Sequence, residues 1–445
     1  MWQLAWPILI GQLATIGMSV TDVAMAGHAS AQDLAGVSLG VSIWNMTILT
    51  LMGLLMSVNP VVAQHVGAEE LDAVPHVVRQ GLWKALAVGL LAMLVANLAA
   101  GVFDTMELEP TVLRVAKGFV HVASASLPAF TCYRVLYGYS TSINQTKPMM
   151  VIALLALLLN GLINWLLVFG NWGFARLGGL GCAWSTMLCV WFNLLALLLW
   201  MRLAPAFRRT WPFAQFEGPS LPMLRSLLKL GVPIGVTYFA ETSAFSLIAL
   251  LIARFGSAQV AAHAIALNFT SLTFMVPLSL GLALLTRVGQ SLGAADPVAA
   301  RFKAWVGVGL TLVFALVSGA GIALWREPIA QAYTSDPHVA LLATQLLLFA
   351  ALFQISDCSQ VVISCAIRAY KVTRAPMLLH LTAFWGFSLP LGVLLGLAPP
   401  WLPFAPDKPM AAQGFWIALV VGLSVAAGGL VLMLRRVTRK QLQHV

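Results

Sequence analysis

Three carboxylates interrupt long apolar stretches of this sequence: Asp22, Glu241 and Asp357. An ionised carboxylate in hydrocarbon costs at least about 2.5–3.5 kcal/mol, so a fold keeps one there when it faces a polar cavity, binds a cation or carries a proton. Three such residues in one chain therefore predict a pathway for ions or protons through a membrane.

Hydroxyl side chains flank two of these carboxylates. Thr242 directly follows Glu241, and Ser356 and Ser359 lie on either side of Asp357. Carboxylate and hydroxyl oxygens suit a hard cation such as Na⁺ and equally suit a proton relay. The alternative for any one of the acids is structural: a carboxyl group that stays protonated and hydrogen-bonds to a neighbouring helix.

Two asparagines in another apolar stretch have helical spacing. Asn160 and Asn164 are four residues apart, so on a helix both side chains lie on the same face. Buried amides are costly without partners, and Asp22 is the partner that we expect for them. The alternative is that they form interhelical hydrogen bonds that only hold the helices together.

Asp336 directly precedes Pro337, which predicts that Asp336 caps the N-terminus of a helix. A contact between Asp336 and a cationic substrate is the second interpretation. Phe274 and Met275 belong to the many Phe and Met residues that either line an adaptable cavity or face lipid and core. The five cysteines lie in apolar stretches without a CxxC pair, and we expect buried thiols rather than disulfides or metal ligands.

Membrane-spanning helices are the elements that must position these residues. Hydrophobic residues make up 60% of the chain and charged residues 9%, against about 25% charged in soluble domains. About twenty apolar residues in a helix cross the hydrocarbon core. The sequence predicts an all-α integral membrane protein with spans near 3–26, 35–64, 78–103, 115–141, 148–170, 179–201, 230–253, 259–286, 303–325, 339–367, 376–398 and 411–434.

The twelve predicted transmembrane helices fall into two similar halves, related by one constant offset of 226 in the numbering. Leu4-Ala5-Trp6-Pro7-Ile8 matches Leu230-Gly231-Val232-Pro233-Ile234, and Ala63-Gln64-His65-Val66-Gly67-Ala68 matches Gly289-Gln290-Ser291-Leu292-Gly293-Ala294. Six spans is an even number, so the two six-helix lobes have the same orientation and form a parallel internal repeat. Transporters with such repeats place the substrate between or within them.

We expect an N-terminal lobe at 1–201, a basic linker at 202–229, and a C-terminal lobe with a short tail at 230–445. Of the 25 Lys and Arg residues, 18 lie in the tail and the connections on one side and six in those on the other. This bias predicts that both termini are cytoplasmic. The net charge of +10 is then a topology signal, which argues against nucleic acid as a partner.

Motifs for other chemistries are missing from the sequence. It contains no GxxxxGK[ST] phosphate loop, no HExxH and no GxSxG. We therefore expect neither an enzyme nor a cofactor, and energy for transport must come from an ion gradient or from partner subunits.

Several segments together resemble the multidrug and toxic compound extrusion (MATE) family, in particular its bacterial NorM branch. The resemblance covers essentially the whole chain, including twelve spans in two halves and the basic linker. The matching segments are Val20-Thr21-Asp22-Val23-Ala24-Met25-Ala26-Gly27, Ser57-Val58-Asn59-Pro60, Ala63-Gln64, Pro233-Ile234-Gly235 with Glu241, and Asp357 with Arg368-Ala369-Tyr370-Lys371-Val372-Thr373.

The resemblance implies a V-shaped pair of helical lobes, functioning as a monomer in the bacterial inner membrane. It also implies export of small organic cations or amphipathic drugs in exchange for Na⁺, H⁺ or both. By position, Glu241 and Asp357 match the family's cation-site carboxylates in the C-terminal lobe and form a tentative Na⁺ site. Asp336 and Phe274 match positions near the drug, although Phe274 stands where some relatives have Tyr.

Asp22, Asn160 and Asn164 match the polar cluster of the N-terminal lobe, with Asp22 a candidate for both coupling and substrate binding. The repeat offset sends Asp22 to Ile248 and Glu241 to Thr15, so neither acid has a symmetry mate. We therefore expect two separate polar sites, one in each lobe.

An ion-coupled antiporter that works by alternating access is the leading hypothesis. The alternative is a lipid-linked glycan flippase of the same broad superfamily. A flippase favours a cationic cavity for pyrophosphate, whereas the spans carry three acids against one clear arginine, Arg134. A membrane-embedded enzyme and a passive channel are less consistent with the duplication and with two separate clusters.

Overall fold

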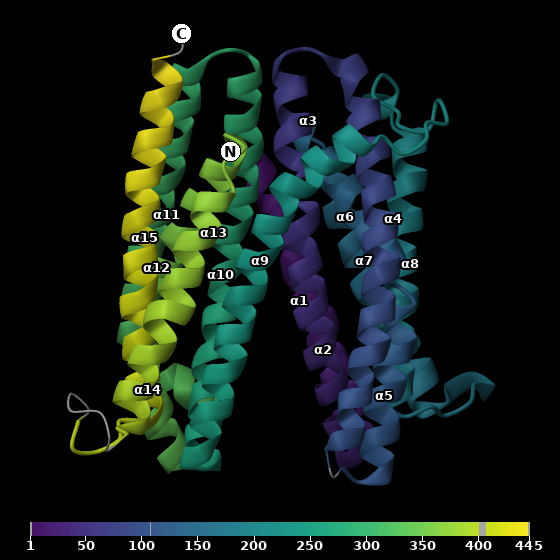
Figure 1. Cartoon of the computed structure of the whole chain (residues 1–445). Coiled ribbons are helices and arrows are strands. Elements are labelled where there is room, and N and C mark those ends of the chain that lie inside the picture. The colour runs from purple at the N-terminus through teal and green to yellow at the C-terminus, as the bar shows by residue number, and fades with distance from the viewer. Residues whose placement is uncertain (1, 107, 400–405, 444–445) are drawn as a thin grey trace. The chain divides into compact units, whose positions relative to one another are not determined.

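The computed structural model describes residues 2–106, 108–399 and 406–443, and this part of the chain is helical, without a β-strand. Two compact units divide it, Trp2–Gly235 and Val236–Val445, and the boundary lies inside the helix α9 (Figure 1). All five cysteines are free thiols; four are buried and Cys132 is half-buried. The predicted lobe and linker limits remain predictions.

The first unit consists of α1 to α8 and the start of α9. Pro7 lies inside its first helix, and the Ser30 side chain caps α2 by accepting a hydrogen bond from the Asp33 amide. The helices are α1 (Trp2–Ala29), α2 (Ala31–Leu55), α3 (Val58–Gly67), η1 (Leu71–Ala73), α4 (Val74–Ala99), η2 (Ala100–Thr105), α5 (Pro110–Ser124), α6 (Leu127–Ser142), α7 (Lys147–Phe169), η3 (Asn171–Gly173), α8 (Gly179–Leu203), η4 (Pro205–Phe207) and α9 (Leu221–Ile252).

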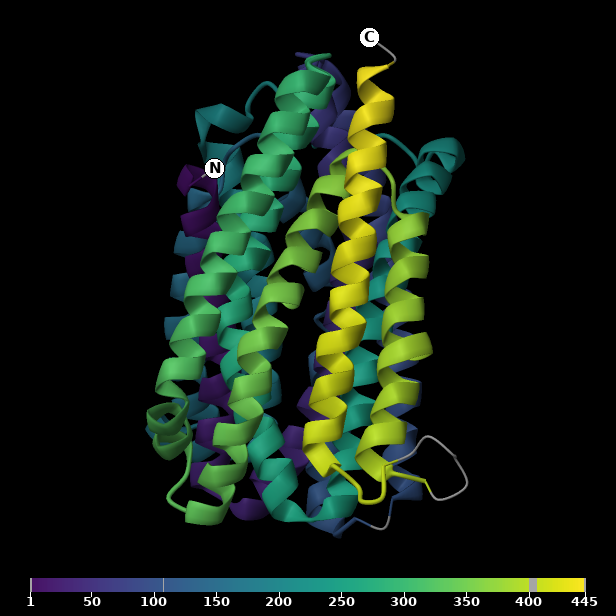
Figure 2. The ribbon, with the colours of Figure 1, turned by 90° about the vertical axis from the view of Figure 1, so that its left-hand side faces the viewer.

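The second unit continues from α9 and is organised around α12, which packs against α10, α11 and α15. Figure 2 shows α15, in yellow, beside the yellow-green α13 and α14. Its core contains large buried side chains such as Trp416, Phe415 and Phe384. The helices after α9 are η5 (Ala253–Phe255), α10 (Ser257–Gly293), α11 (Pro297–Tyr333), α12 (Pro337–Ala369), α13 (Arg374–Leu381), the π-helical η6 (Thr382–Ser388), α14 (Leu389–Leu397) and α15 (Ala411–Leu442).

The helices confirm the predicted all-α membrane fold. Eleven helical segments in the described residues are long and apolar enough to cross a membrane. The twelfth predicted span, 115–141, is divided between α5 and α6 by a turn at Ala125–Ser126, so neither half is long enough alone. The predicted span 35–64 is also broken, at Met56–Ser57, yet its two helices follow each other directly.

The internal repeat is visible in the helix limits. The segment Ala31–Gly67 contains α2 and α3, and shifting it by the repeat offset gives the limits of α10, Ser257–Gly293. Pro7 and Pro233, which the same offset relates, each lie inside a helix. The repeat therefore extends from sequence to structure, although α10 is continuous where its counterpart is broken.

Two helix limits differ from the predicted ones. The helix α9 begins at Leu221, inside the predicted linker, because the apolar residues after Pro222 continue the helix. The helix α11 extends to Tyr333, beyond the predicted limit at 325. Trp325 has non-helical dihedral angles and Pro328 follows, so the predicted limit coincides with a kink.

Candidate functional site

The N-terminal lobe brings Asp22 together with both predicted asparagines. Asp22 lies on α1 and accepts hydrogen bonds at Oδ1 from Asn160 Nδ2 at 2.9 Å and from Asn164 Nδ2 at 2.6 Å, both on α7. Thr186 of α8 donates to Asp22 Oδ2 at 2.9 Å. The three predicted residues are buried, with Asp22 5% exposed. A three-helix polar cluster therefore exists where the sequence predicts it.

This N-terminal cluster stabilises a carboxylate, because the three donors together satisfy both of its oxygens. Ser185 supports the arrangement by accepting from Asn160 Nδ2 at 3.0 Å and donating to the Asn160 carbonyl at 3.1 Å. The Asn164 Oδ1 atom is buried and has no hydrogen-bond partner among the described residues. The cluster thus retains one free acceptor beside the carboxylate.

The C-terminal lobe brings Glu241 of α9 and Asp357 of α12 to one amide group. Gln360 Nε2 lies 3.5 Å from Glu241 Oε1 and 3.3 Å from Asp357 Oδ1. Asp357 is 5% exposed and Gln360 2%, whereas Glu241 is half-buried. The sequence predicts that these two acids share a site, and the geometry places a bridging glutamine between them.

His380 of α13 extends this C-terminal cluster. Its Nε2 lies 2.6 Å from Gln360 Oε1, and its Nδ1 lies 2.8 Å from the carbonyl oxygen of Pro376. Only 1% of His380 is exposed. An imidazole therefore lies on the far side of the amide that faces the carboxylates.

A buried arginine accompanies the two acids. Arg368, near the end of α12, is 6% exposed, and its guanidinium lies 5.4 Å from the ring centroid of Tyr238, one turn before Glu241 on α9. A guanidinium over an aromatic face is held by cation–π attraction. Its positive charge partly offsets the two carboxylates, which low-dielectric surroundings would otherwise disfavour.

The flanking hydroxyls do not converge on the carboxylates. Thr242 donates to the Tyr238 carbonyl at 2.9 Å, and Ser359 donates to the Ile355 carbonyl at 2.7 Å. Ser356 pairs with the Ser424 hydroxyl at 2.8 Å. Serine and threonine in helices often bond back to the preceding turn, so these three contribute less to cation binding than the sequence pattern indicates.

Asp336 caps α12, as its position before proline predicts. Its side chain accepts from the amides of His338 at 2.8 Å and Val339 at 3.4 Å, and it is exposed. Phe274 is half-buried on α10. Its neighbour Thr273 donates to Gln354 of α12 at 3.2 Å, which joins α10 to the helix that carries Asp357. Substrate contacts of Asp336 and Phe274 remain proposals.

Lys84 is a buried cation that the sequence interpretation assigns to a connection between spans. It lies on α4, is 2% exposed, and donates to the Ser57 hydroxyl at 2.6 Å and to the Leu54 carbonyl at 3.2 Å. These two acceptors lie at the break between α2 and α3. Lys84 therefore satisfies backbone and hydroxyl groups that the interrupted helix leaves free.

Four polar residues of the sites are missing from the sequence-based set: Gln360, His380, Arg368 and Lys84. Gln360 follows Asp357 by three residues and so shares its helix face, which is a signal that could have found it. Lys84 lies six residues inside a predicted span. His380 belongs to another helix, and sequence spacing gives no indication of its contact with Gln360.

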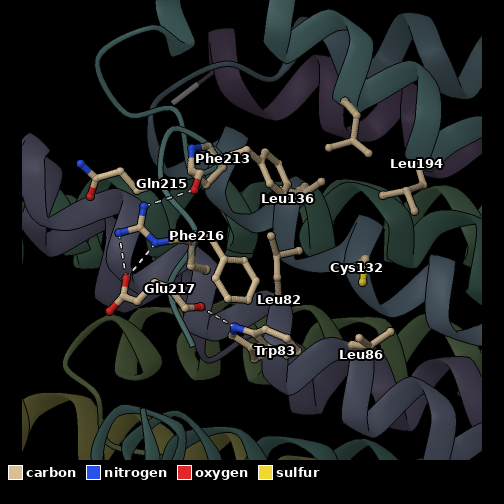
Figure 3. A pocket seen from close by; sticks show the side chains of 13 residues that line it. Leu82, Trp83, Leu86, Cys132, Leu136, Leu194, Phe213, Gln215, Phe216 and Glu217 are labelled. Atoms are coloured by element: carbon tan, nitrogen blue, oxygen red, sulfur yellow. Dashed lines mark hydrogen bonds and ion pairs between the residues drawn. The ribbon is translucent and has the colours of Figure 1, made fainter. Parts of the chain in front are cut away.

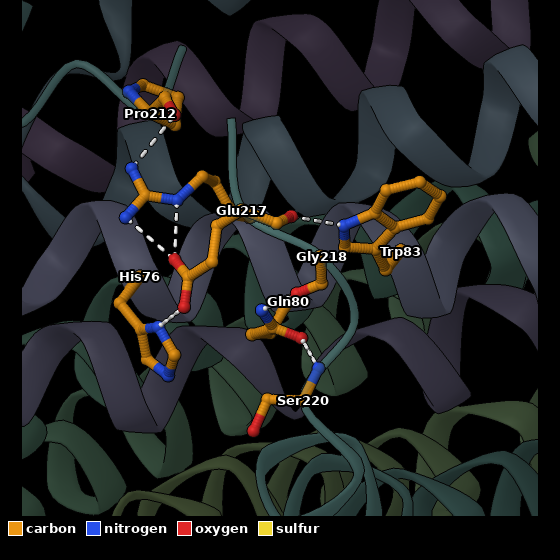
Figure 4. A network of polar contacts seen from close by, with 8 residues as sticks. His76, Gln80, Trp83, Pro212, Glu217, Gly218 and Ser220 are labelled. Atoms are coloured by element: carbon orange, nitrogen blue, oxygen red, sulfur yellow. Dashed lines mark hydrogen bonds and ion pairs between the residues drawn. The ribbon is translucent and has the colours of Figure 1, made fainter. Parts of the chain in front are cut away.

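A separate polar network joins the segment before α9 to α4. Residues 76, 79, 80 and 83 share one face of α4, and Figure 4 shows them gathered around Glu217 and Ser220. Arg79 Nε and His76 Nδ1 donate to the Glu217 carboxylate at 2.8 and 2.6 Å. Gln80 accepts from the Ser220 amide at 2.7 Å, and Trp83 donates to the Glu217 carbonyl at 2.8 Å. We call this network the linker clasp.

Glu217 is held in its charged form by the clasp. Partial burial opposes ionisation, but the hydrogen bonds from Arg79 and His76 outweigh it and lower the pKa of Glu217 below its ordinary value. Beside the clasp lies an apolar pocket of about 340 Å³, lined by residues such as Leu82, Leu136 and Phe213 (Figure 3). The clasp and the pocket lie outside both carboxylate clusters.

The described residues contain no group of three or more His, Cys, Asp or Glu side chains that could hold a metal ion. The donor set at Glu241 and Asp357 offers two carboxylates. Such a set fits a transported proton or monovalent cation better than a resident metal centre. Two repeated sets of membrane-crossing helices, each with a carboxylate held by amides, define a membrane transporter.

Comparisons with known proteins identify the family. A model described as MatE matches residues 7–166 and 233–394. The probable multidrug resistance protein NorM of Chromobacterium violaceum is 42% identical over 99% of this chain and 94% of its own length. The multidrug resistance protein PmpM of Pseudomonas aeruginosa is 41% identical over 98% of this chain and 91% of its own.

A solved structure agrees with these relatives. The MATE transporter NorM-NG in complex with rhodamine 6G and a monobody has a TM-score of 0.83 and 34% identity, covering 99% of this chain and 94% of that chain. The chain belongs to the MATE family. Its members are secondary transporters, which confirms that this multi-pass membrane protein is not an enzyme.

Proposed function

We propose that this protein is an ion-coupled antiporter that exports small organic cations or amphipathic drugs in exchange for Na⁺, H⁺ or both. The observation that carries the proposal is the convergence of Glu241 and Asp357 on Gln360 inside the C-terminal lobe. Two carboxylates beside one amide form a site where one positive charge can bind and be released.

The substrate class is supported by the relatives. Proteins named for multidrug resistance are 41–42% identical to this chain over nearly its full length, and NorM-NG was solved in complex with rhodamine 6G. Asp22, Asp336 and Phe274 are the residues that we propose for contact with the substrate. Asp22 suits a cationic compound because it carries a carboxylate inside the membrane.

In the proposed mechanism, a coupling cation that binds Glu241 and Asp357 from outside neutralises the pair. This changes the relative stability of the two access states, and a ligand shifts such an equilibrium only through its differential affinity for them. Substrate release outside and cation release inside then complete one cycle. Asp22 with Asn160 and Asn164 provides a second polar site in the other lobe.

We propose the bacterial inner membrane as the location, a monomer as the working unit, and the cytoplasm as the side of both termini. The Lys and Arg bias supports this orientation. Lys84 is the exception within that bias, because its ammonium is buried against Ser57.

Neutral substitutions of the carboxylates test the proposal directly. In cells lacking other exporters, Glu241→Gln and Asp357→Asn should each slow ethidium efflux at least 10-fold, because an amide cannot bind and release the coupling charge. The rates are measured by fluorescence and normalised to the amount of protein in the membrane.

The matched control is Asp296→Asn. Asp296 caps α11 by accepting from the Ala299 amide, and asparagine caps helices equally well, so efflux should stay at the wild-type rate. Wild-type efflux from Glu241→Gln and Asp357→Asn would remove the pair from the mechanism.

A further inference from the structure

The hydrogen bonds of His380 define its proton positions. Its Nδ1 lies 2.8 Å from the Pro376 carbonyl, which can only accept, so Nδ1 carries a hydrogen. Its Nε2 lies 2.6 Å from one end of the Gln360 amide. When His380 is neutral, Nε2 is an acceptor and needs the NH₂ of Gln360. When His380 is charged, Nε2 is a donor and needs the Gln360 oxygen.

The opposite end of Gln360 faces Glu241 and Asp357. With a charged His380, the NH₂ of Gln360 points to the two carboxylates and donates to both. With a neutral His380, the amide is flipped end for end, its oxygen points to the pair, and a protonated carboxyl must donate to it. Each orientation satisfies every hydrogen bond, but each requires a different distribution of protons.

Charge balance favours the same two arrangements. With both carboxylates ionised, the charges on Glu241 and Asp357 are balanced by Arg368 and a charged His380. With one carboxyl protonated and His380 neutral, the remaining carboxylate is balanced by Arg368. Both arrangements are neutral in total, which buried charges require, and they differ only in where one proton lies.

We propose that Gln360 is a hydrogen-bond switch through which His380 and the Glu241–Asp357 pair share one proton. His380 holds this proton while the pair is ionised, and a cation that binds the pair displaces the proton from His380. The inference rests on the proposed function of the pair as the coupling site. It adds His380 and Gln360 as positioning residues that set the pH range of coupling.

The neighbouring elements contribute few competing charges. The helix α12 presents Asp357 and Arg368, and α9 presents Glu241 and Tyr238. The other elements packed on α13 are η6, which has no titratable side chain, and α15, whose basic residues begin at Arg435. On α13 itself, Arg374 occupies the first position.

The substitution His380→Gln tests the switch. Glutamine can donate to Gln360 or accept from it, so the hydrogen bond is kept while the transferable positive charge is lost. The pair then keeps its own proton to higher pH, since an adjacent cation no longer favours ionisation. The pH midpoint of ethidium transport in proteoliposomes should move upward by about 1 unit.

The matched control is His263→Gln. His263 is a second buried histidine of the same lobe, whose Nδ1 accepts from Trp416 Nε1 at 3.1 Å. Its replacement should leave the pH midpoint at the wild-type value. A second variant, Gln360→Met, removes the amide but keeps the ring, and its midpoint should also move upward. Combining it with His380→Gln should add little further shift, because the two residues act through one contact.

Wild-type midpoints in His380→Gln and Gln360→Met, with both proteins monodisperse on size exclusion, would overturn the switch. If His380→Gln does not fold, Gln360→Met alone decides. Failure of the proposed function would look different: Glu241→Gln and Asp357→Asn would then keep wild-type transport, whatever the midpoint of the His380 variant.

Discussion

At the scale of residues, each lobe holds a buried carboxylate against a side-chain amide. Asn160 and Asn164 donate to Asp22 in one lobe, and Gln360 donates to Glu241 and Asp357 in the other. An amide presents NH₂ on one side and oxygen on the other, so it can donate to a carboxylate or accept from a carboxylic acid. Amides therefore suit sites where a carboxyl group changes its proton or bound cation.

The N-terminal cluster leads to a prediction about stability. Asn164→Leu removes the 2.6 Å donor to Asp22 and leaves a buried carboxylate oxygen with fewer partners. The loss should destabilise the protein by about 1–3 kcal/mol, and the melting temperature of the purified protein should fall by a few degrees. Asn45→Leu, an identical change at an exposed position of α2, is the control. Equal melting temperatures for the two variants would contradict the role given to Asn164.

The sequence reveals some site residues and hides others for physical reasons. A charge in an apolar run is costly, so Asp22, Glu241 and Asp357 are conspicuous, and Asn160 with Asn164 have helical spacing. Neutral Gln360 and His380 are less costly in a membrane helix and are less conspicuous. Arg368 lies just past a predicted span limit, and only the packed structure shows that its side chain is buried.

At the scale of elements, the segment before α9 is attached to α4 rather than loose. The clasp uses side chains of His76, Arg79 and Gln80 at i, i+3 and i+4, which face Glu217 and Ser220. Apolar runs predict the helices, but a basic linker sequence does not indicate that its one glutamate pairs with the next helix face. That contact depends on tertiary packing.

The clasp should protect the linker from proteolysis. Arg208 and Arg209 are exposed trypsin sites, and Glu217→Ala should accelerate their cleavage roughly 3-fold, because several hydrogen bonds that hold the linker are lost. Asp104→Ala removes another carboxylate of the same lobe, which pairs with Lys117 at 2.6 Å, and should leave the cleavage rate unchanged. Equal rates for Glu217→Ala and wild type would show that the clasp does not hold the linker.

The pH dependence of the clasp follows from the lowered pKa of Glu217. A carboxyl with a lowered folded-state pKa contributes stability above its ordinary pKa, and this stability is lost as the pH falls through the folded-state pKa. The difference in melting temperature between wild type and Glu217→Ala should therefore be largest at neutral pH. It should shrink below about pH 4.

At the scale of the whole molecule, the duplicated fold could be predicted from apolar runs and a repeated offset. The broken helices could not, because Met56–Ser57 and Ala125–Ser126 lie in runs that remain apolar on both sides. Buried Lys84 and Arg368 also remove the charge imbalance that disfavoured a glycan flippase. Membership of the MATE family now carries that distinction.

The central claim is that Glu241 and Asp357 couple cation movement to drug movement. Its most direct measurement is cation flux driven by an outward ethidium gradient in proteoliposomes, recorded with a pH dye and with radioactive Na⁺ in separate samples. Wild-type protein should move one of the two cations against ethidium, and the responding sample identifies the coupling ion. The Glu241→Gln/Asp357→Asn protein should move neither, whereas cation flux at the wild-type rate in that variant would contradict the account.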